Sequence, residues 1–143
     1  GDNINDNPER DSTEKAIIEF GIRNKIPLFG ICRGMQVINK FFGGKQHVTN
    51  NSKHVNTDHQ IDLTKDFPFC DKKSITVNSY HNNIIEIKDV GKNLKSFAIH
   101  QNDNTVEGFF HNELPITGVM WHPERNPDEN SIQLFQRIFS LEN

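Results

Sequence analysis

The spacing of apolar residues changes along the chain from helical to strand-like, and this alternation predicts an α/β fold. Asp11 or Ser12 can cap a helix that runs to about residue 24. Its expected apolar face comprises Ala16, Ile17, Phe20 and Ile22. Residues 25–31, KIPLFGI, are apolar on both faces, which is typical of a central parallel strand. A second helix is predicted over residues 34–42, because two glycines follow it as a stop signal.

The rest of the chain is rich in predicted strands and closes with a helix. Residues 45–73 are polar and loop-rich, with one candidate strand at 54–63. Further strands are predicted at residues 74–81, 94–100, 106–110 and 116–121, with a turn at 102–104. The last helix begins near residue 128 or 130, and its apolar positions are Ile132, Phe135, Ile138 and Phe139. Because no repeat or linker interrupts the pattern, we expect one domain over residues 1–143.

Composition narrows the class of protein. The charges are interspersed at a net −3, so neither a nucleic-acid partner nor a membrane surface is indicated. Two cysteines are too few for a disulfide scaffold, and the sequence has no leader and no long apolar run. We therefore expect a soluble, cytoplasmic protein.

The chain opens GDNINDNPERD, with neither an initiator methionine nor an apolar strand before its first helix. We therefore expect the domain to be incomplete at its N-terminus. In the complete protein, at least two further strands would pack beside residues 27–31.

Cys32 lies between the first predicted strand and the second helix, with Gly30 and Gly34 two residues to either side. A tight strand-to-helix turn exposes its central residue at the sheet edge, and small neighbours avoid collisions there. The positive end of the helix would favour thiolate over thiol, and the N–H of Arg33 can stabilise an oxyanion. A buried structural cysteine between incidental glycines fits this motif alone equally well.

The second component of a candidate site is GVMWHPER, residues 118–125. Pro123 biases His122 toward extended backbone, where residues i and i+2 lie on the same side. Glu124 can then reach the imidazole of His122, fix its tautomer and stabilise the imidazolium. Together with Cys32, these residues support the hypothesis of a thiol-based acyl-transfer site.

GICRGMQ followed by WHPE resembles the class I, triad-type glutamine amidotransferases, and within them the branch named for γ-glutamyl-γ-aminobutyrate hydrolase. The resemblance covers nearly the whole chain, through ERD-T, IPLFGICRGMQVIN, FFGG, VNSYH and GVMWHPE. It implies a flavodoxin-like α/β fold with a mostly parallel sheet flanked by helices, and a site at the strand carboxyl ends. Arg33 favours the stand-alone hydrolases over the ammonia-channelling synthetases, which more often have an apolar or tyrosine residue there.

The resemblance also implies roles for individual residues. Cys32 would attack the γ-carbonyl of a glutamine-like substrate, with His122 carrying the proton and Glu124 orienting it. Arg33 would supply one oxyanion N–H, and Gly1 would be the remnant of a loop that supplies the second. The positions that match the substrate-binding ones are Gln36, Asn78, Ser79 and Tyr80.

Several of these residues also have simpler interpretations. Gln36 can be a solvent-facing helix residue, and Asn78 and Ser79 can simply stabilise a turn at the end of the strand. His81, at the strand tip, either lines the pocket as a further substrate-binding residue or faces water.

The remaining histidines do not indicate a metal site. His47, His54 and His59 fit no common zinc spacing, so we expect solvated loop histidines there. Surface positions are expected for His100 and His111, and packing or a surface position for Cys70. No metal, nucleotide or flavin cofactor is implied.

The sequence thus predicts a hydrolase that cleaves a small-molecule γ-glutamyl amide to glutamate and an amine. The first alternative is a glutaminase subunit that supplies ammonia to a synthetase partner. The second is a non-catalytic domain that has kept the fold. The amine part of the substrate and the oligomeric state, a homo-oligomer included, stay open.

Overall fold

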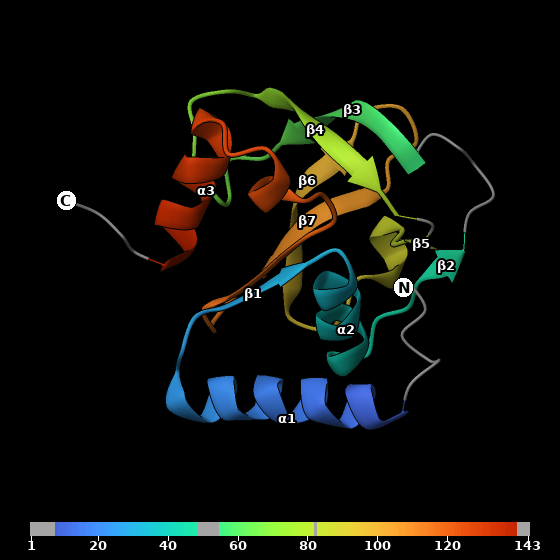
Figure 1. The fold of residues 1–143 in the computed structure, drawn as a ribbon, viewed down its shortest axis with the longest axis vertical. Coiled ribbons are helices and arrows are strands. Elements are labelled where there is room, and N and C mark those ends of the chain that lie inside the picture. The colour runs from blue at the N-terminus through green and yellow to red at the C-terminus, as the bar shows by residue number, and fades with distance from the viewer. Residues whose placement is uncertain (1–7, 49–54, 82, 140–143) are drawn as a thin grey trace.

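The computed structural model describes residues 8–48, 55–81 and 83–139, which form a sheet with helices against its two faces (Figure 1). The helices are α1 (Pro8–Asn24), α2 (Arg33–Phe41) and α3 (Glu129–Phe139), with the 3-10 helices η2 (Ile87–Asp89) and η3 (Pro123–Arg125). The strands are β1 (Leu28–Ile31), β2 (His47–Val48), β3 (Val55–Leu63), β4 (Ser74–Tyr80), β5 (Asn83–Ile84), β6 (Leu94–His100), β7 (Val106–His111) and β8 (Ile116–Val119). No helix in this part of the chain is long and apolar enough to cross a bilayer.

Six strands form one sheet in the order β1-β8-β7-β6-β3-β4, and β2 pairs separately with β5. The β1–β8 pair is parallel, and the other four pairs of the large sheet are antiparallel. The sheet is therefore mixed, and the prediction of a mostly parallel sheet is wrong for the described strands. Short turns connect β6, β7 and β8, and such turns join antiparallel strands, whereas a parallel pair needs a long crossover.

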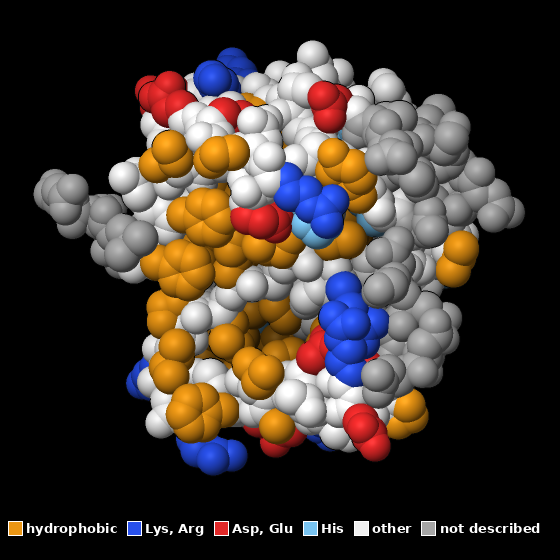
Figure 2. All heavy atoms as spheres, viewed as in Figure 1, with side chains coloured by type: hydrophobic (Ala, Val, Ile, Leu, Met, Phe, Trp, Pro, Cys, Tyr) orange, Lys and Arg blue, Asp and Glu red, His pale blue; other side chains and the backbone are white. Residues whose placement is uncertain are grey.

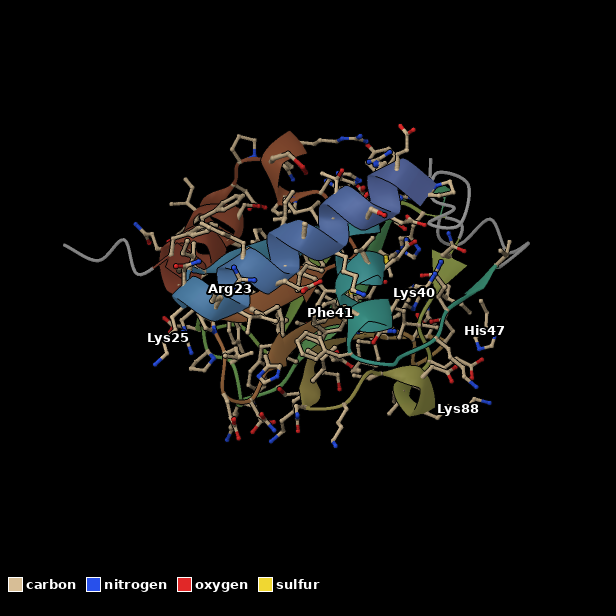
Figure 3. The ribbon with its side chains drawn as sticks, turned by 90° about the horizontal axis from the view of Figure 1, so that it is seen from below. Arg23, Lys25, Lys40, Phe41, His47 and Lys88 are labelled. Atoms are coloured by element: carbon tan, nitrogen blue, oxygen red, sulfur yellow. The ribbon has the colours of Figure 1, made fainter. Side chains whose placement is uncertain are left out.

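The core consists of two apolar clusters. Leu134 and Ile138 of α3 belong to one cluster. Met35 and Ile38 of α2, with Ile18 of α1, belong to the other. Seen from below in Figure 3, α1 lies across α2 and forms the outermost layer on this side. The prediction of helices flanking the sheet is confirmed.

The apolar face predicted for α1 is wrong in part. The helix begins before the expected cap, so Asp11 lies within its first turn. Ile18 and Gly21 are buried, while Ile17 and Phe20 are 55% and 56% exposed. The helix approaches β1 through Gly21, where a Cβ would lie 2.7 Å from a leucine side chain of the strand. The face of α1 that contains Gly21 therefore packs against β1.

β1 lies at an edge of the six-stranded sheet, although its two apolar faces predicted a central position. Among the described strands it pairs only with β8. A groove of about 140 Å³ runs beside it, lined mainly by apolar side chains of α1, β1 and α2. Figure 2 shows hydrophobic side chains gathered around a hollow between α1 and β1.

Candidate active site

Cys32 forms the turn between β1 and α2, with φ 53° and ψ −103°. A positive φ is costly for a residue other than glycine, and such strain often occurs at functional sites. The N–H of Cys32 donates to the Val119 carbonyl of β8 at 2.8 Å, and its own carbonyl accepts from the Gln36 N–H at 3.2 Å. The turn is thus attached to the sheet on one side and to α2 on the other.

The two glycines around Cys32 differ in what they contribute. A Cβ at Gly30 would lie 2.6 Å from the backbone of Gly34, so the expected crowding is confirmed there. A Cβ at Gly34 would meet no described atom within 4 Å, so the same expectation is wrong at that position. The tight turn depends on the glycine of the strand.

Cys32 is only 5% exposed, so the prediction that this turn exposes its central residue is wrong. The hydrogen bond to Val119 holds the turn against the end of β8. Met120 and Trp121 follow there, and they are 0% and 3% exposed.

His122 lies three residues after β8 and pairs with Glu124. Its Nδ1 is 3.1 Å from Oε1 and 3.3 Å from Oε2 of that carboxylate, which confirms the expected contact. The expected extended backbone is wrong, because Pro123 begins η3, and a single 3-10 turn also brings the two side chains together. With Nδ1 facing a carboxylate, Nδ1 carries the hydrogen and Nε2 is left for proton transfer.

The β1–β8 pair brings the two parts of the site to one edge. Gly30 is aligned with Gly118 and Ile31 with Val119, so the parallel strands end level with each other. Cys32 and His122 therefore both follow the carboxyl ends of adjacent strands. This is the edge at which open α/β sheets place their sites.

The side chain of Arg33 points toward α1. Its Nε donates to Glu14 Oε1 and its Nη2 to Asp11 Oδ1, each at 3.1 Å. The oxyanion role of its N–H stays a prediction. Gln36 is fully buried, with Nε2 3.7 Å from the sulfur of Met120, and its substrate-binding role stays a prediction too.

The side chains at the end of β4 lie in different surroundings. Asn78 Oδ1 accepts from the His122 N–H at 2.8 Å, and Asn78 Nδ2 donates to the His122 carbonyl at 2.9 Å. Ser79 and His81 are fully buried. The substrate-binding predictions for these three residues remain untested, and Gly1 lies outside the described residues.

Tyr80 is the exposed member of this segment. It is 41% exposed, and the centroid of its ring lies 5.9 Å from that of His122. The guanidinium of Arg125 lies over the tyrosine ring at 4.8 Å from its centroid. An aromatic surface and a positive charge thus adjoin the candidate base.

A buried charged cluster around Glu107 was not predicted from the sequence. Glu107 of β7 is 1% exposed, and its carboxylate contacts Nε2 of His59 and, at 3.3 Å, Nε2 of His81. Burial raises the pKa of Glu107, but hydrogen bonds from the two imidazoles outweigh it and lower this pKa to about 2. The sequence indicated this buried charge only through a single glutamate within the otherwise apolar run TVEGFF.

Three histidines expected in water are buried. The side chain of His59 is 7% exposed, and His100, whose ring centroid lies 4.2 Å from that of His59, is 1% exposed. His111 is 7% exposed, and its Nδ1 accepts two backbone N–H groups at 3.0 Å. Burial lowers the pKa of His111, with Glu113 opposing it. His54 lies outside the described residues.

One group of side chains in the described part of the chain has donor spacing suited to a metal ion. His47, Glu86 and Asp89 place one ligand atom each within 4.8 Å of one another. Figure 3 shows His47 near η2, which carries Lys88. Lys88 Nζ lies 3.4 Å from Glu86 and His47 Nε2 lies 2.8 Å from Asp89, so an exposed ion-pair network accounts for the group equally well.

Residues 2–124 match the family model of peptidase C26. Because the match covers most of the chain, the chain belongs to the peptidase C26 family, which is of the class I glutamine amidotransferase type. The family prediction is confirmed.

Individual relatives agree with this assignment. The γ-glutamyl-CDP-amidate hydrolase of Campylobacter jejuni is 38% identical over 133 residues, which cover 93% of this chain and 60% of that protein. A carbamoyl phosphate synthase small chain of Pyrobaculum aerophilum is 31% identical over 136 residues, which cover 94% of this chain and 37% of that one. The chain thus spans about 60% or less of the length of these relatives.

The fold is shown by comparison with a solved structure. A glutamine amidotransferase of Thermotoga maritima superimposes with a TM-score of 0.71 at 16% identity, covering 96% of this chain and 65% of that one. A GMP synthase-like protein of Thermoplasma acidophilum superimposes with a TM-score of 0.80 at 21% identity, covering 99% of this chain and 68% of that one. The predicted flavodoxin-like class is confirmed.

Proposed function

We propose that the chain carries the hydrolytic site of a γ-glutamyl amide hydrolase, with Cys32 as nucleophile, His122 as base and Glu124 as the orienting acid. The pairing of β1 with β8 supports this most strongly. It places the strained Cys32 turn and the His122–Glu124 pair at the carboxyl ends of adjacent parallel strands. A φ of 53° is energetically costly for a cysteine, and a purely structural role at the end of β1 would not require it.

In the proposed reaction the sulfur of Cys32 attacks the γ-carbonyl carbon while His122 Nε2 takes the thiol proton. The N–H of Arg33 donates to the oxyanion. The C–N bond then breaks, the amine leaves with the proton from His122, and a γ-glutamyl thioester remains. Water gives a proton to His122 while its oxygen attacks the thioester carbonyl carbon; the C–S bond then breaks, the sulfur of Cys32 takes the proton back from His122, and glutamate is released. Glu124 stabilises the imidazolium formed in both halves.

The leaving side of the substrate would be anionic. The Campylobacter relative is named for a substrate whose amine is part of a CDP-amidate. Arg125, stacked on Tyr80 beside His122, supplies an exposed positive charge where the leaving amine must be protonated. On the glutamyl side we propose Gln36, Tyr80 and the backbone of residues 78, 79 and 81, because the side-chain amide of Asn78 is bonded to His122 and the side chains of Ser79 and His81 are buried.

A glutaminase subunit that serves a synthetase partner is the second candidate function. The identity with a carbamoyl phosphate synthase small chain favours it. A protein of this kind turns over glutamine poorly until its partner is added. Independent turnover therefore distinguishes the two functions.

The test is release of glutamate by the complete protein from γ-glutamyl amides with neutral and with phosphorylated leaving groups. We expect turnover without a partner, faster for the phosphorylated amides, and a loss of about a thousandfold or more in Cys32→Ala. Cys70→Ala, which alters the other cysteine, is the matched control and should keep the rate. Wild-type turnover by Cys32→Ala would rule out the proposed nucleophile.

A further inference from the structure

The contact between Asn78 and His122 joins parts of the sheet that the strand order separates. Four ladder steps lie between β8 and β4. At about 4.8 Å per step, a flat sheet would place these strands about 19 Å apart. Asn78 nevertheless makes hydrogen bonds of 2.8 and 2.9 Å to the backbone of His122. In Figure 1, β3 and β4 cross over β6 and β7 instead of continuing the sheet as a flat layer.

The buried cluster around Glu107 lies inside this curled part of the sheet. Glu107 comes from β7, His59 from β3 and His81 from the residue after β4. One carboxylate oxygen contacts His59 and the other contacts His81. A buried carboxylate is stable only when it is paired, so these contacts restrain β3 and β4 relative to β7.

The geometry at His81 fixes its position from both sides. Nδ1 is 2.7 Å from the carbonyl oxygen of Asn83, which can only accept, so Nδ1 carries a hydrogen. Nε2 lies 3.3 Å from the second oxygen of Glu107. The ring of His81 is thus in contact with a backbone carbonyl on one side and with the carboxylate of Glu107 on the other.

The contacts of Glu107 can affect the position of His122, the candidate base, through a short stretch of β4. Asn78 is three residues before His81, and its register with Asp58 of β3 is part of a regular antiparallel ladder. Its amide holds the peptide groups on both sides of His122. His122 itself lies beyond the end of β8, where the sheet no longer supports it.

We propose that Glu107 is a positioning residue for His122: paired with His59 and His81, it fixes the end of β4, and Asn78 transmits this position to the backbone of the base. The inference rests on the proposed function for its catalytic readout. In this arrangement the amide of Asn78 serves the base and not the substrate.

The experiment compares Glu107→Gln, Asn78→Ala and the double variant in the complete protein, using the γ-glutamyl amide that it hydrolyses best. Each single variant should lower kcat about tenfold and leave KM within twofold. Because both act through one path, the double variant should be no slower than the slower single variant. Multiplied losses in the double variant would refute the path through Asn78.

His111→Gln is the matched control, since it alters another buried titratable side chain of the same strand, β7. It should lower the unfolding temperature without changing kcat. If Glu107→Gln does not fold, Glu107→Asp replaces it in the experiment. This variant keeps the charge but shortens the side chain, and it should also lower kcat.

A second readout does not depend on activity. The ring signals of His122 in NMR spectra, assigned with His122→Gln, should shift in the Glu107 and Asn78 variants and stay in place in His111→Gln. Unchanged His122 signals in the Glu107 variant would overturn the inference. Shifted signals in a protein that hydrolyses no γ-glutamyl amide would refute the proposed function and leave the positioning role intact.

Discussion

At the residue scale, the backbone of Cys32 is the feature on which the site depends. A non-glycine residue with φ 53° costs about 1–3 kcal/mol unless its neighbours hold it there. The hydrogen bonds to Val119 and from Gln36, together with the close approach at Gly30, are what hold it. The spacing of the glycines predicted the turn, but the burial of Cys32 depends on residues about 90 positions away in the sequence.

The two glycines of the turn give a direct comparison. Gly30→Ala should destabilise the fold by about 2–3 kcal/mol, because its Cβ would lie 2.6 Å from backbone that cannot move aside. Gly34→Ala should be neutral or stabilise by up to about 1 kcal/mol, since there is space in a helix that favours alanine. Chemical denaturation measures both, and equal effects would contradict the described turn.

Glu107 predicts a defined sensitivity to acid. Its pKa is lowered from 4.5 to about 2 in the folded protein, so its contribution to stability is complete above about pH 4.5 and is lost as the pH falls toward 2. The contribution amounts to about 3 kcal/mol. The difference in unfolding free energy between wild type and Glu107→Gln should therefore shrink between pH 5 and about pH 2.5. A constant difference would show that the carboxylate is not paired as described.

At the element scale, one arginine joins α1 to the turn that carries the nucleophile. Asp11 was expected as a helix cap, but Asp11 and Glu14 both accept hydrogen bonds from Arg33 at the start of α2. The ERD-T motif thus has a tertiary role that a local interpretation could not find. α1 packs on α2, and this contact fixes the first helix relative to Cys32.

Replacing Arg33 with leucine should destabilise the protein by about 1–2 kcal/mol, because two partly buried carboxylates lose the contact with its largely buried guanidinium. Arg10→Ala is the matched control, since Arg10 pairs with the same Glu14 at 3.0 Å but its side chain is 53% exposed. We expect an effect below about 0.5 kcal/mol there. Urea unfolding measures the free energy of unfolding of both variants. A larger loss in Arg10→Ala than in the Arg33 variant would contradict the role given to Arg33.

At the scale of the whole molecule, we predict that the outer edge of β1 binds a further strand, because among the described strands β1 pairs only with β8 and an apolar groove runs beside it. The N–H of Leu28 donates to the carbonyl of Pro115, just before β8, and the N–H of Cys32 donates to Val119 at its end. By alternation, the N–H groups of Phe29 and Ile31 point away from β8, beside the apolar groove. In the 143-residue chain these two amides should exchange rapidly with solvent. In the complete protein they should become protected. Hydrogen exchange measures this, and rapid exchange in both forms would contradict the prediction.

The sequence predicted most elements and the contact between His122 and Glu124, because these depend on local spacing. The mostly parallel sheet was implied by the family resemblance, and it is wrong because the short turns between β6, β7 and β8 join antiparallel strands. The cluster of Glu107, His59 and His81 could not be found from the sequence. Its members are 22 to 48 positions apart, and they meet only because β3 and β4 curl over the sheet.

The central claim is that Cys32 carries the acyl group. The most direct test is mass spectrometry of the complete protein, quenched in acid during turnover of a γ-glutamyl amide and digested. We expect one γ-glutamyl group on the peptide that contains Cys32, none on the peptide of Cys70, and slower loss of this group in His122→Gln. A γ-glutamyl group on any other residue, or steady turnover by a protein in which Cys32 has been replaced by alanine, would contradict it.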